Sequence, residues 1–149
     1  MIYLVDTNVV LRAVNTQDAQ HNVCVSATSE LFRRGAILSI STQVVAEFWN
    51  VITRPSDARP PGSYGFDTME AEKHLIRAER MFEVLPDPAG LYECWRDIVL
   101  QHKVVGTQVH DARLAAWAMA YNADGILTLN GKDFARFPQV TVVNPNDVV

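Results

Sequence analysis

Hydrophobic and polar positions divide this chain into two kinds of segment. Short apolar runs, each too short for a helix, predict five strands: Ile2–Val5, Ala36–Ile40, Phe82–Leu85, Gly125–Leu129 and Val140–Val143. Longer amphipathic stretches predict six helices: Thr7–Val14, Asn22–Arg33, Gln43–Thr53, Thr68–Met81, Ala89–His102 and His110–Tyr121. Apolar strands that alternate with helices are typical of a sheet that is covered on both faces. We therefore expect an α/β fold with a mostly parallel five-stranded sheet.

The length of the chain, 149 residues, is that of one domain, so we expect a single domain over residues 1–149. The stretch "RPSDARPPGSYGFD", from Arg54 to Asp67, is rich in proline, glycine and serine. Such a composition predicts a mobile excursion from the domain, and no domain boundary.

Composition indicates the cellular compartment in which the protein is expected. Hydrophobic residues make up 48% of the chain and charged residues 20%, which is ordinary for a soluble globular protein. No apolar run approaches the roughly 18 residues of a membrane span, and the N-terminus lacks the basic flank of a secretory signal. Cys24 and Cys94 are far apart and have no metal-binding or redox spacing. We expect a cytoplasmic protein that makes no contact with membranes.

A carboxylate stands where the first predicted strand ends. Asp6 follows the apolar run "IYLV" directly, and another apolar run begins three residues later. In open α/β sheets, ligands bind in the crevice at the carboxyl ends of the strands. Aspartate is also a good N-cap, so Asp6 could simply begin the next helix. The segment alone leaves both interpretations open.

Three more acids follow strand ends or lie on neighbouring helices. Glu47 lies at the edge of the apolar stripe of its helix, and Asp111 shares a helical face with Leu114. Asp133 comes shortly after the fourth strand, behind an Asn130–Gly131 turn. Each acid also has a purely structural alternative: a solvated surface group, compensation of a helix dipole, or an N-cap at Asp133.

Carboxylates gathered at one edge of a sheet would need a cation. Two like charges at ~5 Å repel by about 3 kcal/mol at an effective dielectric constant of ~20. A cluster with only oxygen ligands suits Mg²⁺ or Mn²⁺. The formal net charge of −4 argues against a basic surface for nucleic acids. Bound metal ions would nevertheless attract a phosphodiester to such a pocket.

Four stretches in this order resemble the PIN-domain ribonucleases, particularly the VapC-type toxins of toxin–antitoxin pairs. They are "VDTNVVLRAV", "STQVVAEFWNVITRP", "QVHDARLAAWA" and "ILTLNGKDFARFP", and the resemblance covers essentially the whole chain. The resemblance implies a metal-dependent endoribonuclease that cleaves RNA with one or two Mg²⁺ or Mn²⁺ ions in an acidic pocket. It also implies a homodimer and a VapB-type antitoxin as partner.

The resemblance assigns catalytic and metal-binding roles to Asp6, Glu47 and Asp111, and supporting roles to Asn8 and Thr128. A metal held by Asp6 and Asp111 would lower the pKa of a bound water, which Glu47 would orient or deprotonate.

The chain departs from the family pattern at Asn130, where many relatives carry aspartate. Asp133 is therefore expected as a metal ligand at the rim of the pocket, with Asn130 in a supporting role. Either residue could complete the site, and the number of metal ions depends on which of them does.

Other functions remain as alternatives. A haloacid-dehalogenase-like phosphatase would use Asp6 as nucleophile, but it needs an acid where Asn8 stands. A phospho-accepting receiver domain needs paired acids, and Thr7 follows Asp6 instead. A catalytically weak PIN-fold protein-interaction module is the alternative from a different class.

Four basic residues are expected to flank the pocket and to contact RNA phosphates, unless they are solvated surface charges: Arg12, Arg54, Lys132 and Arg136. His110 adjoins Asp111, but neighbouring residues on a helix diverge by about 100°, so we expect it to face away from the pocket.

Overall fold

A computed structural model describes residues 1–58 and 62–149. Five strands form one sheet: β1 (Ile2–Val5), β2 (Ile37–Ser41), β3 (Glu83–Leu85), β4 (Gly125–Leu127) and β5 (Val142–Val143). Their order is β3-β2-β1-β4-β5, and all neighbouring pairs run parallel. The predicted parallel sheet is confirmed, with each strand within two residues of its expected bounds at either end.

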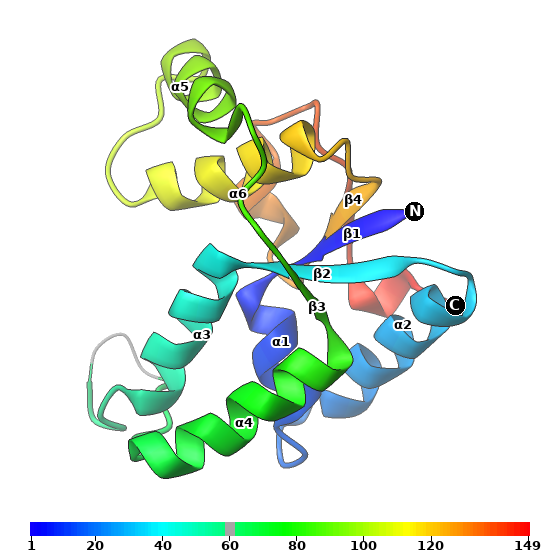
Figure 1. The fold of residues 1–149 in the computed structure, drawn as a ribbon, viewed down its shortest axis with the longest axis vertical. Helices are drawn as coiled ribbons and strands as arrows, with labels where there is room; N and C mark the ends of the chain where they lie inside the picture. The colour runs from blue at the N-terminus through cyan, green and yellow to red at the C-terminus, as the bar shows by residue number, and fades with distance from the viewer. Residues whose placement is uncertain (59–61) are drawn as a thin grey trace.

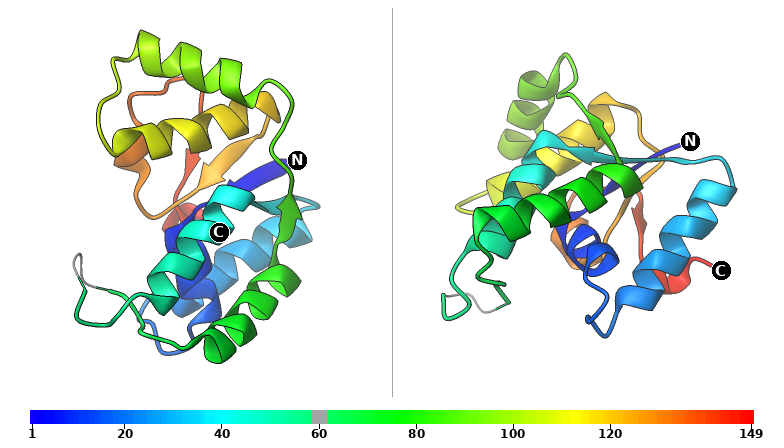
Figure 2. Two further views of the ribbon diagram at one scale, coloured as in Figure 1. Left: turned by 60° about the vertical axis from the view of Figure 1, so that its left-hand side comes forward. Right: turned by 60° about the horizontal axis from the view of Figure 1, so that its bottom comes forward.

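Six helices cover the sheet: α1 (Thr7–Val14), α2 (His21–Arg33), α3 (Thr42–Thr53), α4 (Thr68–Met81), α5 (Leu91–Gln101) and α6 (Gln108–Ala120). In Figures 1 and 2, α5 and α6 lie on one face of the sheet, and α1, α2 and α4 lie on the other. Two short 3₁₀ helices, η1 (Gly131–Phe134) and η2 (Pro145–Asp147), were not expected from the pattern of apolar residues. The predicted α/β class is confirmed.

Apolar side chains fill the space on both faces of the sheet, as its parallel strands require. Leu4 and Val5 of β1, and Ile126 and Leu127 of β4, are fully buried, and so is Trp117 of α6. Complete burial of an aliphatic side chain of this size contributes about 1.5–3 kcal/mol. These central strands are therefore rigid supports for the residues that follow them.

The described part of the proline- and glycine-rich segment returns along the end of α3. Three backbone hydrogen bonds hold it there: Tyr64 donates to Val51, Gly65 to Arg54 and Phe66 to Ile52. Residues 62–67 of the expected mobile excursion are thus fixed against the helix. Residues 59–61 of that excursion lie outside the described residues.

The topology brings several segments to the carboxyl edge of the sheet. The chain moves from β1 through β2 to β3 on one side, then crosses back to β4 and β5 on the other. The carboxyl ends of β1 and β4 therefore form a topological switch point, where open α/β sheets bind ligands. Because α6 leads back to the start of β4, its first turn lies near this edge (Figure 1).

Among the described residues, no helix combines the length and apolar character that a membrane crossing requires.

Candidate active site at the carboxyl edge of the sheet

Asp6 and Thr128 lie side by side because β1 and β4 are in register. Val5 pairs with Leu127, and the backbone N–H of Asp6 donates to the Leu127 carbonyl at 2.9 Å. Asp6 follows the last residue of β1 and Thr128 follows the last residue of β4, so the two lie next to each other. The Thr128 hydroxyl donates to Asp6 Oδ2 at 2.8 Å. Only 8% of the Asp6 surface is exposed. The prediction that Thr128 accompanies this acid is confirmed in its position.

Asp6 also caps α1, so the N-cap interpretation is confirmed, while its role in binding a ligand stays a prediction. Its Oδ1 accepts the backbone N–H of Thr7 at 2.8 Å, and its Oδ2 accepts Asn8 Nδ2 at 3.1 Å. Asn8 in turn donates to the Thr128 hydroxyl and accepts the backbone N–H of Leu129. Burial raises the pKa of Asp6 although these hydrogen bonds oppose the shift. Asn8 thus joins the start of α1 to the end of β4.

Glu47 reaches the site from the second turn of α3. The Ser41 hydroxyl caps this helix by accepting the backbone N–H of Val44 at 3.1 Å. The half-buried Glu47 carboxylate is held at both oxygens: Thr7 Oγ1 donates to Oε2 at 2.8 Å, and Gln43 Nε2 donates to Oε1 at 2.9 Å. The expected position at the edge of the apolar stripe is confirmed. The sequence reasoning did not identify Thr7 and Gln43 as its partners, although the four-residue spacing of Gln43 and Glu47 on one helix is a signal for such a contact.

Asp111 lies in the first turn of α6 and is half-buried. Leu114 and Ala115, which share its helical face, are buried, so the expectation that this acid points inward is confirmed. Burial raises the pKa of Asp111 to about 6, and the negative charges of Asp133, Asp6 and Glu47 add to the shift. The negative charges of Glu47 and Asp133 are therefore close enough to Asp6 and Asp111 to raise the pKa of both groups further.

Asp133 lies within η1 and does not cap it. The capping position is Asn130, whose side chain makes no capping hydrogen bond, and the backbone N–H of Asp133 donates to the Asn130 carbonyl at 3.0 Å. The N-cap alternative for Asp133 is wrong. Together with Asp111, this acid lines a cleft of about 110 Å³. The side chain of Asn130 is exposed, and its backbone N–H donates to the Thr128 hydroxyl at 3.0 Å.

Gly131 allows η1 to pack closely against β5. A Cβ atom at this position would lie 2.9 Å from Cγ1 of Val142, closer than side chains pack. Valine is stiff because it branches at Cβ, so it cannot easily turn away from such a contact. A residue larger than glycine would therefore move η1, and Asp133 with it.

Two of the four basic residues expected at the pocket line the cleft itself. Lys132 and Arg136 line the same cleft as Asp111 and Asp133. Arg12 donates to Gln20 and to the backbone carbonyl of Asn8, both at 2.9 Å, and Arg54 donates to Ser63 at 2.6 Å. Arg12 therefore lies beside Asn8 of the site, and contact of Arg12 and Arg54 with RNA phosphates stays a prediction.

The chemistry of the site suits a hard divalent cation. None of the ion pairs among the described residues involves Asp6, Glu47, Asp111 or Asp133, although Lys132 and Arg136 line the same cleft as Asp111 and Asp133. In residues 1–58 and 62–149, however, no three acidic, histidine or cysteine side chains form a ready-made metal cluster. Mg²⁺ keeps several of its waters and binds proteins through one or two carboxylates. The residues therefore fit an ion held partly through water.

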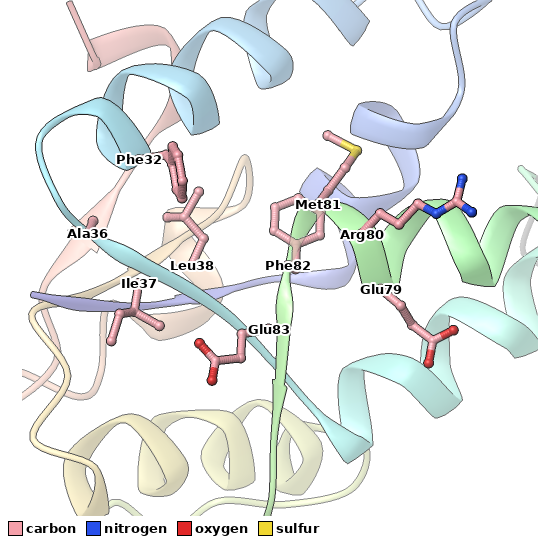
Figure 3. Close-up of a pocket in the computed structure, with 9 residues that line it drawn as sticks. All are labelled: Phe32, Ala36, Ile37, Leu38, Glu79, Arg80, Met81, Phe82 and Glu83. Carbon is pink, nitrogen blue, oxygen red and sulfur yellow. The ribbon is translucent and has the colours of Figure 1, made fainter.

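A larger hollow, of about 360 Å³, lies at the opposite edge of the sheet, near the amino ends of β2 and β3. Figure 3 shows its lining, in which Phe32, Phe82 and Met81 are the largest apolar groups. Its two carboxylates, Glu79 and Glu83, lie on either side of β3 in this view. This hollow is therefore separate from the four acids at the carboxyl edge.

Comparisons with known proteins agree with this architecture. The family model of the PIN domain matches residues 3–140. The fold is similar to VapBC2 from Rickettsia felis bound to a promoter DNA fragment, with a TM-score of 0.70, 22% identity, and coverage of 97% of this chain and 98% of that one. It is also similar to VapBC-1 from nontypeable Haemophilus influenzae, with a TM-score of 0.69, 17% identity, and coverage of 99% and 100%.

A third similar structure is VapC20 from Mycobacterium tuberculosis, described as a toxin that cleaves the sarcin–ricin loop. Its TM-score is 0.60, with 20% identity and coverage of 92% of this chain and 95% of that one. At these identities the likeness shows a shared fold. No curated protein matches the chain.

Proposed function

Because this chain belongs to the PIN-domain family, we propose that it is a metal-dependent endoribonuclease and the toxin of a type II toxin–antitoxin pair. One observation carries the proposal: carboxylates from four separate segments gather near the switch point of the sheet, and none of them forms an ion pair among the described residues. Burial, together with the negative charges of Asp133, Asp6 and Glu47, raises the pKa of Asp111 to about 6. Mg²⁺ or Mn²⁺ would compensate the negative charge of these carboxylates, and the bound ion would attract an anionic phosphodiester.

In the proposed reaction, Asp6 and Asp111 would hold a divalent cation, with Asp133 as a further ligand from the rim of the cleft. A divalent cation here would supply a water of lowered pKa and positive charge beside the scissile phosphate. Glu47 accepts a proton from the attacking water, since Thr7 and Gln43 fix its carboxylate while leaving further lone pairs free. No side chain forms a covalent bond to the RNA.

The substrate is held by the basic residues of the cleft. Lys132 and Arg136 line it on the side of Asp133 and would attract the phosphates that flank the scissile bond. Asn8 and Thr128 keep Asp6 in place through hydrogen bonds of 3.1 and 2.8 Å. The basic residues thus bind the RNA and the polar residues orient Asp6, while the acids hold the cation and take part in the hydrolysis.

The assemblies named for similar structures support two further parts of the proposal. VapBC complexes from Rickettsia felis and Salmonella typhimurium are described as bound to DNA, and one similar structure is a toxin–antitoxin complex from Klebsiella pneumoniae. We propose that this chain likewise pairs with a VapB-type antitoxin and forms a homodimer. The net charge of −4 favours a partner segment that is basic.

Metal-dependent cleavage of RNA tests the proposed activity. Purified protein is incubated with labelled single-stranded and hairpin RNA in Mg²⁺, in Mn²⁺ or in EDTA, and products are resolved on denaturing gels. We expect cleavage with either metal, none in EDTA, and recovery when Mg²⁺ is added back, because the acids need a cation to act together.

Other results would favour the alternatives. An absence of cleavage in every metal would favour a protein-interaction module. Hydrolysis of a small phosphomonoester without cleavage of RNA would favour a phosphatase with Asp6 as nucleophile.

Substitution of Asp133 tests its role at the rim. We expect Asp133→Asn to weaken Mn²⁺ binding about tenfold, as is typical when a group that tunes a metal site is lost. The melting temperature should stay level or rise, because Asp133 caps no helix and its negative charge repels that of Asp111. Calorimetric titration with MnCl₂ and thermal melts measure both quantities.

Asp147 provides the matched control, because it lies in the other 3₁₀ helix, η2, and is exposed. Asp147→Asn should leave Mn²⁺ affinity as in the wild type. An unchanged affinity in Asp133→Asn would remove Asp133 from the proposed ligands.

A further inference from the structure

The side-chain amide of Gln43 joins three parts of the molecule. It lies in the first turn of α3, and its Nε2 donates to Glu47 Oε1 and to the backbone carbonyl of His110, both at 2.9 Å. His110 immediately precedes Asp111 in the chain. One amide group therefore contacts both an acid of the site and the backbone that carries a second acid.

Hydrogen bonds from Arg113, which is itself held by Asp87, fix the orientation of this amide. Arg113 Nη1 donates to Gln43 Oε1 at 2.9 Å, and Arg113 Nη2 donates to Asp87 Oδ2 at 2.7 Å. Thr42 donates to the other oxygen of Asp87 at 3.1 Å. A flipped amide would set its NH₂ group against the Arg113 donors and its oxygen against the Glu47 carboxylate. Only the observed orientation satisfies every neighbour.

All of the hydrogen-bonding groups of the amide nitrogen are used. Its two N–H donors have two acceptors, one on Glu47 and one on His110, and these acceptors come from different helices. The Glu47 carboxylate is held at its other oxygen by Thr7 at 2.8 Å. The side-chain amide of Gln43 thus connects the Glu47 carboxylate directly to the first turn of α6.

We propose that Gln43 is a positioning residue that holds the Glu47 carboxylate in register with Asp111, and that Arg113 and Asp87 lock its amide for this purpose. The proposal rests on the proposed function, since it concerns how the same acidic site receives a divalent cation. Without the amide, Glu47 keeps only its bond to Thr7 and can rotate away. The backbone carbonyl before Asp111 also loses its contact with α3.

Binding of Mn²⁺ alone, without RNA, tests the proposal. Gln43→Met keeps the length of the side chain but removes its hydrogen bonds. We expect Mn²⁺ affinity measured by calorimetry to fall about tenfold, as it does when groups that orient metal ligands are removed. Arg113→Met, which frees the amide to turn, should weaken binding in the same direction but less.

Gln20→Met is the matched control, because Gln20 is also a glutamine that accepts a hydrogen bond from an arginine, Arg12, at 2.9 Å. It lies before α2 and bonds none of the four acids, so we expect wild-type Mn²⁺ affinity. Melts of the metal-free proteins show whether Gln43→Met and Gln20→Met lose comparable stability. A loss of affinity in Gln43→Met alone then cannot come from general loosening.

Three results would overturn the inference: Mn²⁺ affinity of Gln43→Met within twofold of wild type, an equal loss in Gln20→Met, or wild-type affinity in Arg113→Met when Gln43→Met does not fold. Its failure is distinct from failure of the proposed function. If the wild-type protein binds no Mn²⁺ and cleaves no RNA, the proposed function is wrong. If it does both and Gln43→Met binds equally well, only the role of Gln43 is wrong.

Discussion

Replacing Asp6 with asparagine should lower the rate of RNA cleavage about 10³-fold or more, which corresponds to about 4 kcal/mol of lost transition-state stabilisation. Asp6 is the proposed ligand at the switch point of the sheet, and only 8% of its surface is exposed. A neutral amide cannot offer the cation the charge that the carboxylate offers. The loss should persist at saturating Mg²⁺, because the substitution also alters where the ion sits.

The same substitution should leave the chain folded, with a free energy of unfolding within about 1 kcal/mol of wild type. Two effects oppose each other. Removing a buried negative charge relieves the burial penalty and the repulsion that raise the pKa of Asp6. The new NH₂ group, however, replaces an acceptor that receives Asn8 Nδ2 at 3.1 Å.

Gel-based cleavage assays and urea denaturation measure these two quantities in one preparation. Asp97→Asn, on the exposed surface of α5, is a control that should keep wild-type activity. Wild-type cleavage by Asp6→Asn at saturating Mg²⁺ would show that Asp6 is not a metal ligand.

Asp111→Asn should abolish cleavage to a similar extent, yet stabilise the metal-free protein at neutral pH. Burial and three neighbouring acids raise the pKa of Asp111 from 3.8 to about 6. The folded chain therefore binds this proton more tightly than the unfolded chain does. The free energy of unfolding falls as pH rises between these values, and the loss is complete above about pH 6.

The asparagine variant cannot ionise and avoids this loss. At pH 7.5 we expect it to be more stable than wild type by about 1 kcal/mol, after allowance for solvent screening at a half-buried group. That gain corresponds to a rise in melting temperature of roughly 2–4 °C for a chain of this length. Near pH 4 the difference should shrink towards zero, because Asp111 is then largely protonated in the folded wild type.

Thermal melts in EDTA at pH 4 and pH 7.5 check the prediction. Added Mn²⁺ should remove the advantage of the variant at pH 7.5, because the cation stabilises the wild-type acids that bind it. A variant that is less stable than wild type at pH 7.5 would mean that the ionised Asp111 is not under repulsion.

Local pattern alone determined much of this fold. Apolar runs of strand length and the spacing of apolar residues on helices predicted β1, α1 and α4 with their observed bounds. Side-chain period and burial are properties of neighbouring residues, so a single sequence records them. The rule that parallel strands share a carboxyl edge indicated that the four acids can converge there, and the resemblance to PIN-domain ribonucleases assigned Asp6 and Asp111 to one site.

Other features depended on contacts between distant parts of the chain. Asp6 meets Thr128 across 122 residues, and Gln43 meets His110 across 67. Such contacts follow from strand register and side-chain rotamers, which no local pattern encodes. For the same reason only the tertiary structure decided that Arg12 bonds both Gln20 and the backbone carbonyl of Asn8. It also decided that Asp133 lines the cleft without capping η1, because η1 begins two residues before it, at Gly131.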